Sequence, residues 1–176
     1  MINISFLNKK KLFFLGIAIA IVVMFFDLLS KRVIFAILDK IALDQNIENP
    51  EIKICDFSSL IRVWNHGVSF GMFSGVENSQ IIFCLVQSLI LVILVIWLYK
   101  NQKPHFSYAL GLIIGGALGN VIDRFQNAAV ADFLDLHIAQ YHWPAFNLAD
   151  SSVFIGVAIL VFDDLIFSKS PNKSKK

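Results

Sequence analysis

The chain has 176 residues, of which 57% are hydrophobic and 16% are charged, and its mean hydropathy is +0.70. Soluble domains are typically about 45–50% apolar and about 25% charged, so this composition indicates a membrane protein and argues against an ordinary soluble domain. The formal net charge of +2 gives no indication of a nucleic-acid partner.

Four hydrophobic segments predict membrane-spanning helices, because a span needs about 20 mostly apolar residues. The expected spans cover about residues 12–38, 79–99, 106–124 and 146–167. Three lysines precede the first segment, as in a signal peptide, but no small-residue cleavage site follows its apolar run. We therefore expect a helix that is retained in the mature protein.

The distribution of charge predicts the orientation in the membrane. Residues 1–11, 99–105 and 168–176 hold nine of the fifteen Lys and Arg residues and none of the thirteen acids. Under the positive-inside rule these segments, and with them both termini, are cytoplasmic. The basic tail 168–176 is expected to be disordered.

The segment between the first two helices, residues 39–78, does not read as a span. Short alternations of apolar and polar residues at 52–57 and 60–64 predict strands of a small sheet. The expected fold is an all-α integral membrane protein of four transmembrane helices. A small extracytoplasmic β-sheet subdomain is expected between helices 1 and 2, and residues 1–176 are expected to form a single domain.

Cysteines and histidines give no sign of a cofactor or a disulfide. Cys55 lies in a polar loop and Cys84 in an apolar run, so we expect no bond between them. The four histidines look scattered and lack the spacing of metal ligands; they are His66, His105, His137 and His142. No metal and no other cofactor is therefore expected.

Polar residues interrupt the chain where helices should meet the membrane surface. Asp27 and Lys31 are four residues apart on one helix face and can pair. The plainer alternative is a helix-end pair whose lysine extends to the interface. Asn65 and Gly67 flank a tight turn, which needs no function to explain it.

The third hydrophobic segment carries glycines at every fourth position, which form a stripe that allows close helix packing. They are Gly111, Gly115 and Gly119. Asn120, Asp123 and Arg124 then share one helix face near the outer end. They can simply stabilise the helix end, although an acid there is disfavoured by the helix dipole and needs a partner.

Two further acids flank the start of the last hydrophobic segment. Asn147 and Asp150 have the spacing of an N-cap and an acidic N3 residue, so capping alone can explain them. Asp132 lies in a short apolar stretch, 130–133, that returns toward the membrane.

One polar site among the helices explains these residues better than four unrelated helix ends at a single depth. The set comprises Asp27, Asn65, Asn120, Asp123, Arg124, Asp132, Asn147 and Asp150. Two carboxylates without a metal or a Ser–His pair suggest acid–base chemistry of the aspartic-peptidase kind. The alternative is a small transporter or proton-translocating subunit, for which we would expect acids near the bilayer midplane and an inverted repeat.

Five sequence blocks resemble those of the bacterial lipoprotein signal peptidases, the signal peptidase II family. They are DLLSK at 27–31, NHGVSFG at 65–71, GGALGNVIDR at 115–124, VADF at 130–133 and FNLADS at 146–151. The resemblance implies a membrane aspartyl endopeptidase of the bacterial inner membrane. Its substrates would be prolipoproteins, which it would cleave before a cysteine that carries diacylglycerol. Membrane lipids would be further partners, and a monomer is expected.

The resemblance also implies roles for single residues. Asp132 and Asp150 would form the catalytic dyad, with Asp123 as the competing candidate; we prefer Asp132 because Asp123 adjoins Arg124. The supporting or substrate-binding residues would be Asp27, Lys31, Asn65, Gly67, Asn120, Asp123, Arg124, Asn147 and Ala149.

Overall fold

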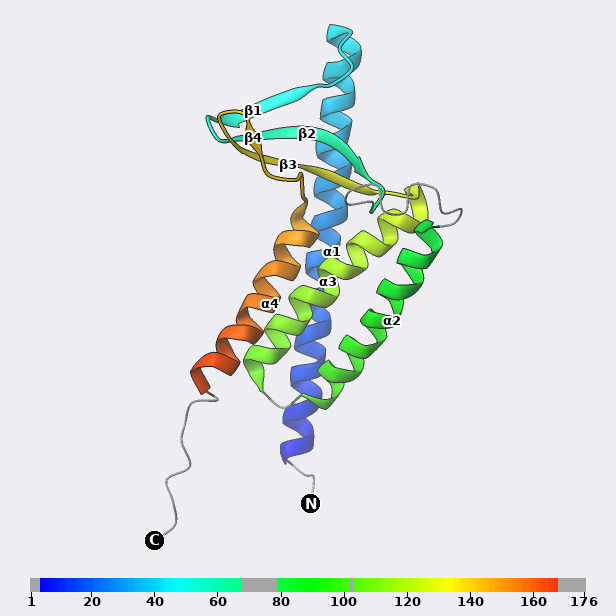
Figure 1. Cartoon of the computed structure of the whole chain (residues 1–176). Helices are drawn as coiled ribbons and strands as arrows, with labels where there is room; N and C mark the ends of the chain where they lie inside the picture. Colours follow the sequence, from blue (N-terminus) through cyan, green and yellow to red (C-terminus); the bar gives the residue numbers. More distant parts are fainter. Residues whose placement is uncertain (1–3, 68–78, 102, 168–176) are drawn as a thin grey trace.

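The computed structural model describes residues 4–67, 79–101 and 103–167 (Figure 1). The predicted tail 168–176 and residues 68–71 of the NHGVSFG block lie outside this part of the chain. Helices form over all four hydrophobic segments. They are α1 (Ile4–Gln45), α2 (Ser79–Lys100), α3 (Pro104–Asn127) and α4 (Leu148–Phe167).

Helix α1 is much longer than a membrane span. Its 42 residues correspond to roughly 60 Å at 1.5 Å per residue, about twice the hydrocarbon thickness of a bilayer. The prediction that residues from 39 onward belong to a β-rich insertion was therefore wrong for 39–45, which are helical. No proline or glycine lies between 32 and 45 to end the helix. Its C-terminal end rises beside the sheet (Figure 1).

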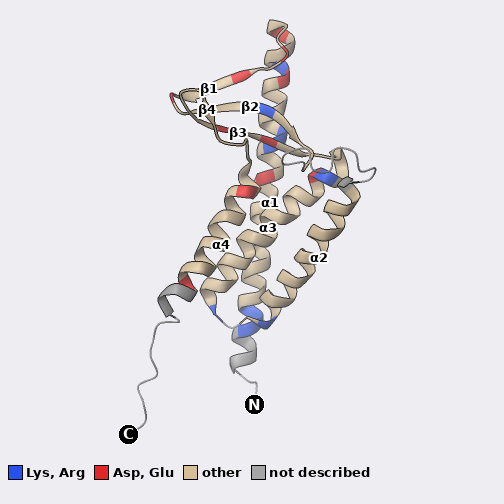
Figure 2. Ribbon diagram, viewed as in Figure 1, with Lys and Arg blue, Asp and Glu red and all other residues tan. Residues whose placement is uncertain are grey.

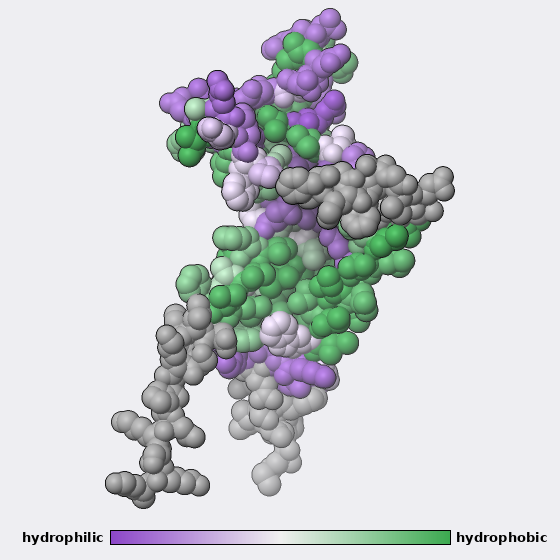
Figure 3. All heavy atoms as spheres, viewed as in Figure 1, coloured by the Kyte–Doolittle hydropathy of each residue, from purple (hydrophilic) through white to green (hydrophobic). Residues whose placement is uncertain are grey.

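Three helices of the described residues are long and apolar enough to cross a membrane: Lys9–Gln45, Ile81–Lys100 and Pro104–Asn127. Charged residues gather toward the two ends of the helical bundle (Figure 2), and a continuous hydrophobic surface lies between them (Figure 3). Exposed aliphatic and aromatic side chains such as Leu85 and Phe154 form this surface. Such a broad exposed apolar surface fits contact with lipid.

A four-stranded antiparallel sheet lies at the end of the bundle where α4 begins (Figure 1). Its strands, in spatial order, are β1 (Glu51–Cys55), β2 (Ser58–Asn65), β3 (Val130–Ile138) and β4 (Tyr141–His142). The prediction placed the sheet between the first two helices only, but β3 and β4 come from the α3–α4 connection. The first residues of β3 are all buried, so their sequence shows no alternation that would predict a strand.

The glycine stripe of α3 allows α1 to approach closely, as its spacing predicts, and Gly116 does the same for α4. A Cβ atom on Gly111 would lie 2.7 Å from the Gly16 carbonyl oxygen of α1, and one on Gly115 would lie 2.6 Å from that of Ala20. Gly116 faces the other way, and a Cβ there would collide with the Ala149 carbonyl of α4. The close approach of the backbones fixes where the polar ends of α1, α3 and α4 meet.

Replacement of Gly115 by valine is expected to destabilise the bundle by about 1–3 kcal/mol, because the new side chain meets a backbone carbonyl that cannot move aside. The measurement is thermal unfolding of the purified protein in detergent. Ser88→Val is the control, since Ser88 lies on an exposed face of α2. An unchanged unfolding temperature in Gly115→Val would contradict this close packing of α3 on α1.

Candidate active site

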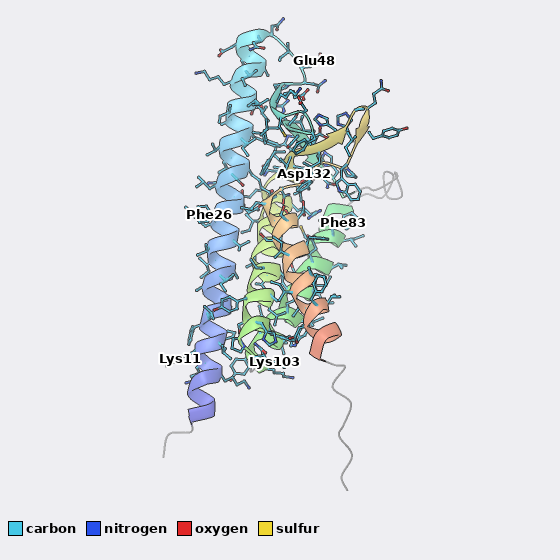
Figure 4. The ribbon with its side chains drawn as sticks, turned by 90° about the vertical axis from the view of Figure 1, so that its left-hand side faces the viewer. Lys11, Phe26, Glu48, Phe83, Lys103 and Asp132 are labelled. Atoms are coloured by element: carbon cyan, nitrogen blue, oxygen red, sulfur yellow. The ribbon has the colours of Figure 1, made fainter. Side chains whose placement is uncertain are left out.

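Asp132 lies on β3, where the sheet meets the helix ends (Figure 4). The chain turns back after β3 and β4, and Phe146 pairs with Leu134 through backbone hydrogen bonds of 2.8 and 3.1 Å. This pairing sets Asn147, the next residue, against Asp132. The strand pairing thus brings the start of α4 to a residue that is distant in sequence.

Asn147 and Asp150 cap the start of α4 reciprocally, as their spacing predicts. The Asp150 backbone N–H donates to the Asn147 Oδ1 atom at 3.0 Å, and the Asn147 N–H donates to the Asp150 Oδ2 atom at 3.2 Å. This is the capping-box arrangement with an acid at N3, where the helix dipole favours negative charge. Capping uses only one carboxylate oxygen, so the other remains for a different contact.

Two asparagines connect Asp132 and Asp150. The Asn147 Nδ2 atom donates to the Asp132 Oδ1 atom at 2.7 Å and is 3.2 Å from the Asn120 Oδ1 atom. The Asn120 Nδ2 atom donates to the Asp150 Oδ1 atom at 2.9 Å. Asn147 is almost completely buried, so its rotamer is fixed by these contacts. Both carboxylates therefore have defined orientations within one hydrogen-bonded network.

The surroundings of Asp132 favour its protonated form. Burial raises the pKa of Asp132 to about 6, and the negative charge of Asp150 acts in the same direction. Hydrogen bonds from Asn65 and Asn147 oppose this shift because they stabilise the carboxylate. A carboxyl group with such a pKa can hold or release a proton near neutral pH.

Asn65 reaches Asp132 from the neighbouring strand. Asn65 pairs with Val130, two residues before Asp132, so both side chains lie on the same face of the sheet. The Asn65 Nδ2 atom donates to the Asp132 Oδ2 atom at 2.9 Å, and the Asn65 Oδ1 atom accepts the Gly67 N–H at 2.8 Å. Gly67 has a φ of 76°, which favours glycine. The turn therefore orients the Asn65 side chain as a hydrogen-bond donor to Asp132.

Lys31 is the buried cation of the site. It pairs with Asp27, as its spacing predicts, with 2.7 Å between the Nζ and Oδ2 atoms. The alternative that Lys31 extends to the interface is wrong, since the residue is only 3% exposed. Its Nζ atom also lies 2.8 Å from the Asp123 Oδ2 atom and donates to the Asn120 Oδ1 atom at 2.9 Å. One ammonium group thus lies within 2.9 Å of three oxygen atoms, two of which belong to carboxylates.

The two acids that pair with Lys31 also accept hydrogen bonds from the backbone of neighbouring elements. The Asp27 Oδ1 atom accepts the backbone N–H of Ala149 at 2.8 Å, which joins α1 to the first turn of α4. Asp123 accepts the Ala131 N–H at 3.3 Å and thereby holds the start of β3. Asp123 has a cationic partner, as expected of an acid at a helix C-terminus, but that partner is Lys31. The adjacent Arg124 instead donates to Gln87 of α2 at 3.0 Å.

A pocket of about 570 Å³ opens beside the start of α4. Its lining is mostly apolar and consists of Leu136, Trp143, Phe146, Asp150, Ser151, Phe154 and Ile155. Trp143 and Phe154 could not be identified from the sequence, because a single exposed aromatic residue resembles any lipid-facing side chain. The pocket places one of the two candidate carboxylates at the edge of an apolar surface.

A second polar cluster lies farther along β3. Asp135 is buried, and the Nδ1 atoms of His137 and His142 lie 2.8 and 2.9 Å from its Oδ2 atom. Burial alone would raise the pKa of Asp135, but hydrogen bonds from the two imidazoles hold it below its ordinary value. The expectation of scattered histidines was wrong for these two. Cys55 and Cys84 are both free.

The sequence model of a family described as Signal peptidase (SPase) II matches residues 19–166 of the chain. A lipoprotein signal peptidase of Anaplasma phagocytophilum (strain HZ) is 43% identical over 115 residues, which are 65% of this chain and 74% of that protein. One of Polynucleobacter necessarius subsp. necessarius (strain STIR1) is 40% identical over 151 residues, which are 85% and 88% of the two chains.

Two solved structures, described as bacterial membrane enzymes determined by the in meso method at 2.3 and 1.9 Å resolution, have similar folds. The first has a TM-score of 0.72 and 27% identity and covers 92% of this chain and 93% of its own. The second has a TM-score of 0.71 and 28% identity and covers 86% of this chain and 93% of its own. Together with the family match over most of the sequence, these likenesses establish that the chain belongs to the signal peptidase II family, a family of membrane peptidases.

Proposed function

We propose that this chain is an aspartyl endopeptidase that removes signal peptides from prolipoproteins and cleaves before a cysteine carrying diacylglycerol. Asp132 and Asp150 are the proposed dyad. The observation that carries the proposal is that Asn147 contacts both carboxylates. Its side-chain Nδ2 atom is 2.7 Å from the Asp132 Oδ1 atom, and its backbone N atom is 3.2 Å from the Asp150 Oδ2 atom. Family membership favours a peptidase over the transporter alternative.

In the proposed mechanism the two carboxylates act on one water molecule. Asp150 lies at the N-terminus of a helix, and its carboxylate accepts two hydrogen bonds. It is the ionised group that takes a proton from water. Asp132, whose pKa is raised, is the acid that donates a proton to the carbonyl oxygen of the scissile peptide. The pH dependence belongs to the pair, because its two titrations are coupled.

The supporting residues have proposed roles that follow from their contacts. Asn120 and Asn147 orient the dyad, and Asn65 with Gly67 orients Asp132 from the sheet. Asp27, Lys31, Asp123 and Ala149 brace the helices beneath it. The Nε atom of Arg124 has no hydrogen-bond partner among the described residues, and we assign it to a backbone carbonyl of the substrate. The pocket beside Asp150 would receive apolar parts of the lipidated substrate.

The placement in the membrane is part of the proposal. We take α4 as the fourth span and both termini as cytoplasmic, in the inner membrane of a bacterium. Figure 2 supports this orientation, since lysines cluster at the end of the bundle near the N-terminus, and in Figure 4 Lys11 and Lys103 lie far from Asp132. The site would then lie near the outer surface, in a single domain that acts as a monomer.

The test uses the purified protein and two prolipoprotein peptides that differ only in the lipid on the cysteine. Mass spectrometry is expected to detect cleavage immediately before the cysteine in the diacylglyceryl peptide and at least tenfold slower cleavage of the unmodified one. No cleavage of either peptide, together with proton flux in liposomes that contain the protein, would overturn the proposal in favour of a transporter.

Replacement of Asn65 by alanine is expected to move the basic limb of the pH–rate profile upward. The lost hydrogen bond stabilises the Asp132 carboxylate, so its removal raises the pKa of Asp132 further and the dyad keeps its proton to higher pH. The profile of kcat/KM against pH measures the shift. A basic limb that stays in place or moves downward would contradict this role of Asn65. Asn127→Ala, which removes an exposed asparagine at the end of α3, is the control.

A further inference from the structure

Three potential metal ligands meet on the sheet, outside the proposed dyad. His137 and His142 are paired directly across β3 and β4, and Asp135 precedes His137 by two residues on the same face of β3. The ligand atoms of the three side chains all lie within 4.8 Å of one another. Asp132 is three positions from Asp135 and therefore belongs to the opposite face of the strand.

We propose that Asp135, His137 and His142 form a binding site for a divalent transition-metal ion of the zinc class. The signal peptidase II assignment does not include this site, and the inference does not depend on the peptidase activity. Two imidazole nitrogens and one carboxylate oxygen are ligands that Zn²⁺ prefers. A metal ion on three protein ligands retains an open position for water or another ligand.

The distances fit such a site. Ligand atoms about 2.0–2.1 Å from one tetrahedral ion lie about 3.3 Å apart. The Nδ1 atom of His137 is 2.8 Å from the Asp135 Oδ2 atom, and that of His142 is 3.0 and 2.9 Å from the Oδ1 and Oδ2 atoms. The two rings are 5.0 Å apart between centroids and inclined by 32°. Bound to one ion, the Asp135–histidine separations would widen by a few tenths of an ångström, and the Nδ1 atoms would have to be unprotonated.

The site is accessible and its carboxylate is shielded. Asp135 is 3% exposed, whereas the His142 side chain is 57% exposed. Both histidines also line an apolar pocket of about 550 Å³ formed with Phe57, Leu136, Ile138, Tyr141 and Trp143. A bound ion would join β3 to the short strand β4, which has only two residues. It would therefore stabilise the hairpin that leads back from Asp132 to Asn147.

Titration calorimetry of the full-length protein in detergent micelles tests the proposal, after removal of any polyhistidine tag and treatment with EDTA. Zn²⁺ is expected to bind wild type with a stoichiometry of one and to raise its unfolding temperature. His142→Ala and His137→Ala are each expected to weaken binding at least tenfold. His105→Ala, which removes a histidine that contacts Asp163 of α4, is expected to bind like wild type.

Absorption spectra with Co²⁺ give a second measurement, which reports the ligands of the bound ion directly. Visible bands of a cobalt ion with nitrogen and oxygen ligands are expected in wild type and should be absent in His142→Ala. His142 is exposed, so this replacement should leave the fold intact. No saturable binding by wild type, or binding that both histidine variants retain, would overturn the proposal and leave the cluster as a hydrogen-bonded group only.

Discussion

Replacement of Asp132 or Asp150 by asparagine is expected to lower kcat/KM for a lipidated prolipoprotein by about 10³-fold or more, because each removes a group that transfers a proton. The two losses should not add, since the carboxylates act as one unit. The double replacement is therefore expected to be about as inactive as either single one. Initial rates of cleavage, measured by mass spectrometry, give the comparison.

The asparagine variants also lose some stability, which must be separated from the loss of chemistry. Both oxygens of Asp132 accept hydrogen bonds, from Asn65 and Asn147. An amide in the same place turns its own donor toward one of them and leaves a poor contact that costs about 1–3 kcal/mol. Thermal unfolding should therefore show a folded protein with a lowered midpoint. Asp44→Asn, at an exposed position on α1, is the control for both measurements.

Asp123→Asn separates the proposed dyad from its competitor. Asp123 contacts Lys31 and the backbone of Ala131, so its replacement is expected to lower stability more than activity. Loss of cleavage in Asp123→Asn with full cleavage in Asp132→Asn would move the dyad to Asp123. The geometry favours Asp132, because the Asn147 side chain that contacts it belongs to the same capping box as Asp150.

The helical part of the fold was predictable because its signals are local. The hydrophobic segments, the glycine spacing of α3 and the Asn147–Asp150 capping box each depend on residues a few positions apart. The Asp27–Lys31 pair was predictable for the same reason. None of these predictions required knowledge of which helices are neighbours.

The strands of the β1–β2 hairpin were predicted from their alternation, but the rest of the sheet was not, because β2 pairs with a strand that is distant in sequence. The second cluster was missed because the β3–β4 hairpin was not predicted. The pairing of β2 with β3 joins residues from two separate connections, and the buried start of β3 shows no alternation. Only the β3–β4 hairpin brings His142 opposite His137. The additional contacts of Lys31 were missed because the packing of α1 on α3, and not spacing along α1, sets them.

Replacement of Lys31 by methionine is expected to destabilise the protein by about 3–5 kcal/mol, a larger effect than that of any other supporting residue. The change leaves the carboxylates of Asp27 and Asp123 buried without their cation. Loss of one partner from a buried ion pair lowers the free energy of unfolding more than loss of a surface pair does. Thermal or urea unfolding in detergent measures the loss. Lys40→Met removes an exposed lysine from the same helix and is expected to have little effect.

A positioning role for Lys31 predicts a loss of activity even where the variant remains folded. Lys31 donates to the Asn120 Oδ1 atom, and Asn120 in turn donates to Asp150. The lysine therefore fixes the orientation of the Asp150 carboxylate indirectly, through Asn120. In Lys31→Met we expect a lower kcat with KM little changed. Lys31→Arg should not restore it, because the larger, planar guanidinium cannot take the place of a compact ammonium group among three oxygen atoms.

A double replacement separates the charge of Lys31 from its packing. Adding Asp123→Asn to Lys31→Met removes one of the two stranded carboxylates, so the double variant should be more stable than Lys31→Met alone. Its kcat should remain low, since Asn120 still lacks its donor. A double variant less stable than Lys31→Met would mean that the Lys31 ammonium group does not neutralise Asp123. The contacts of Lys31 would then not be what positions the residues of the site.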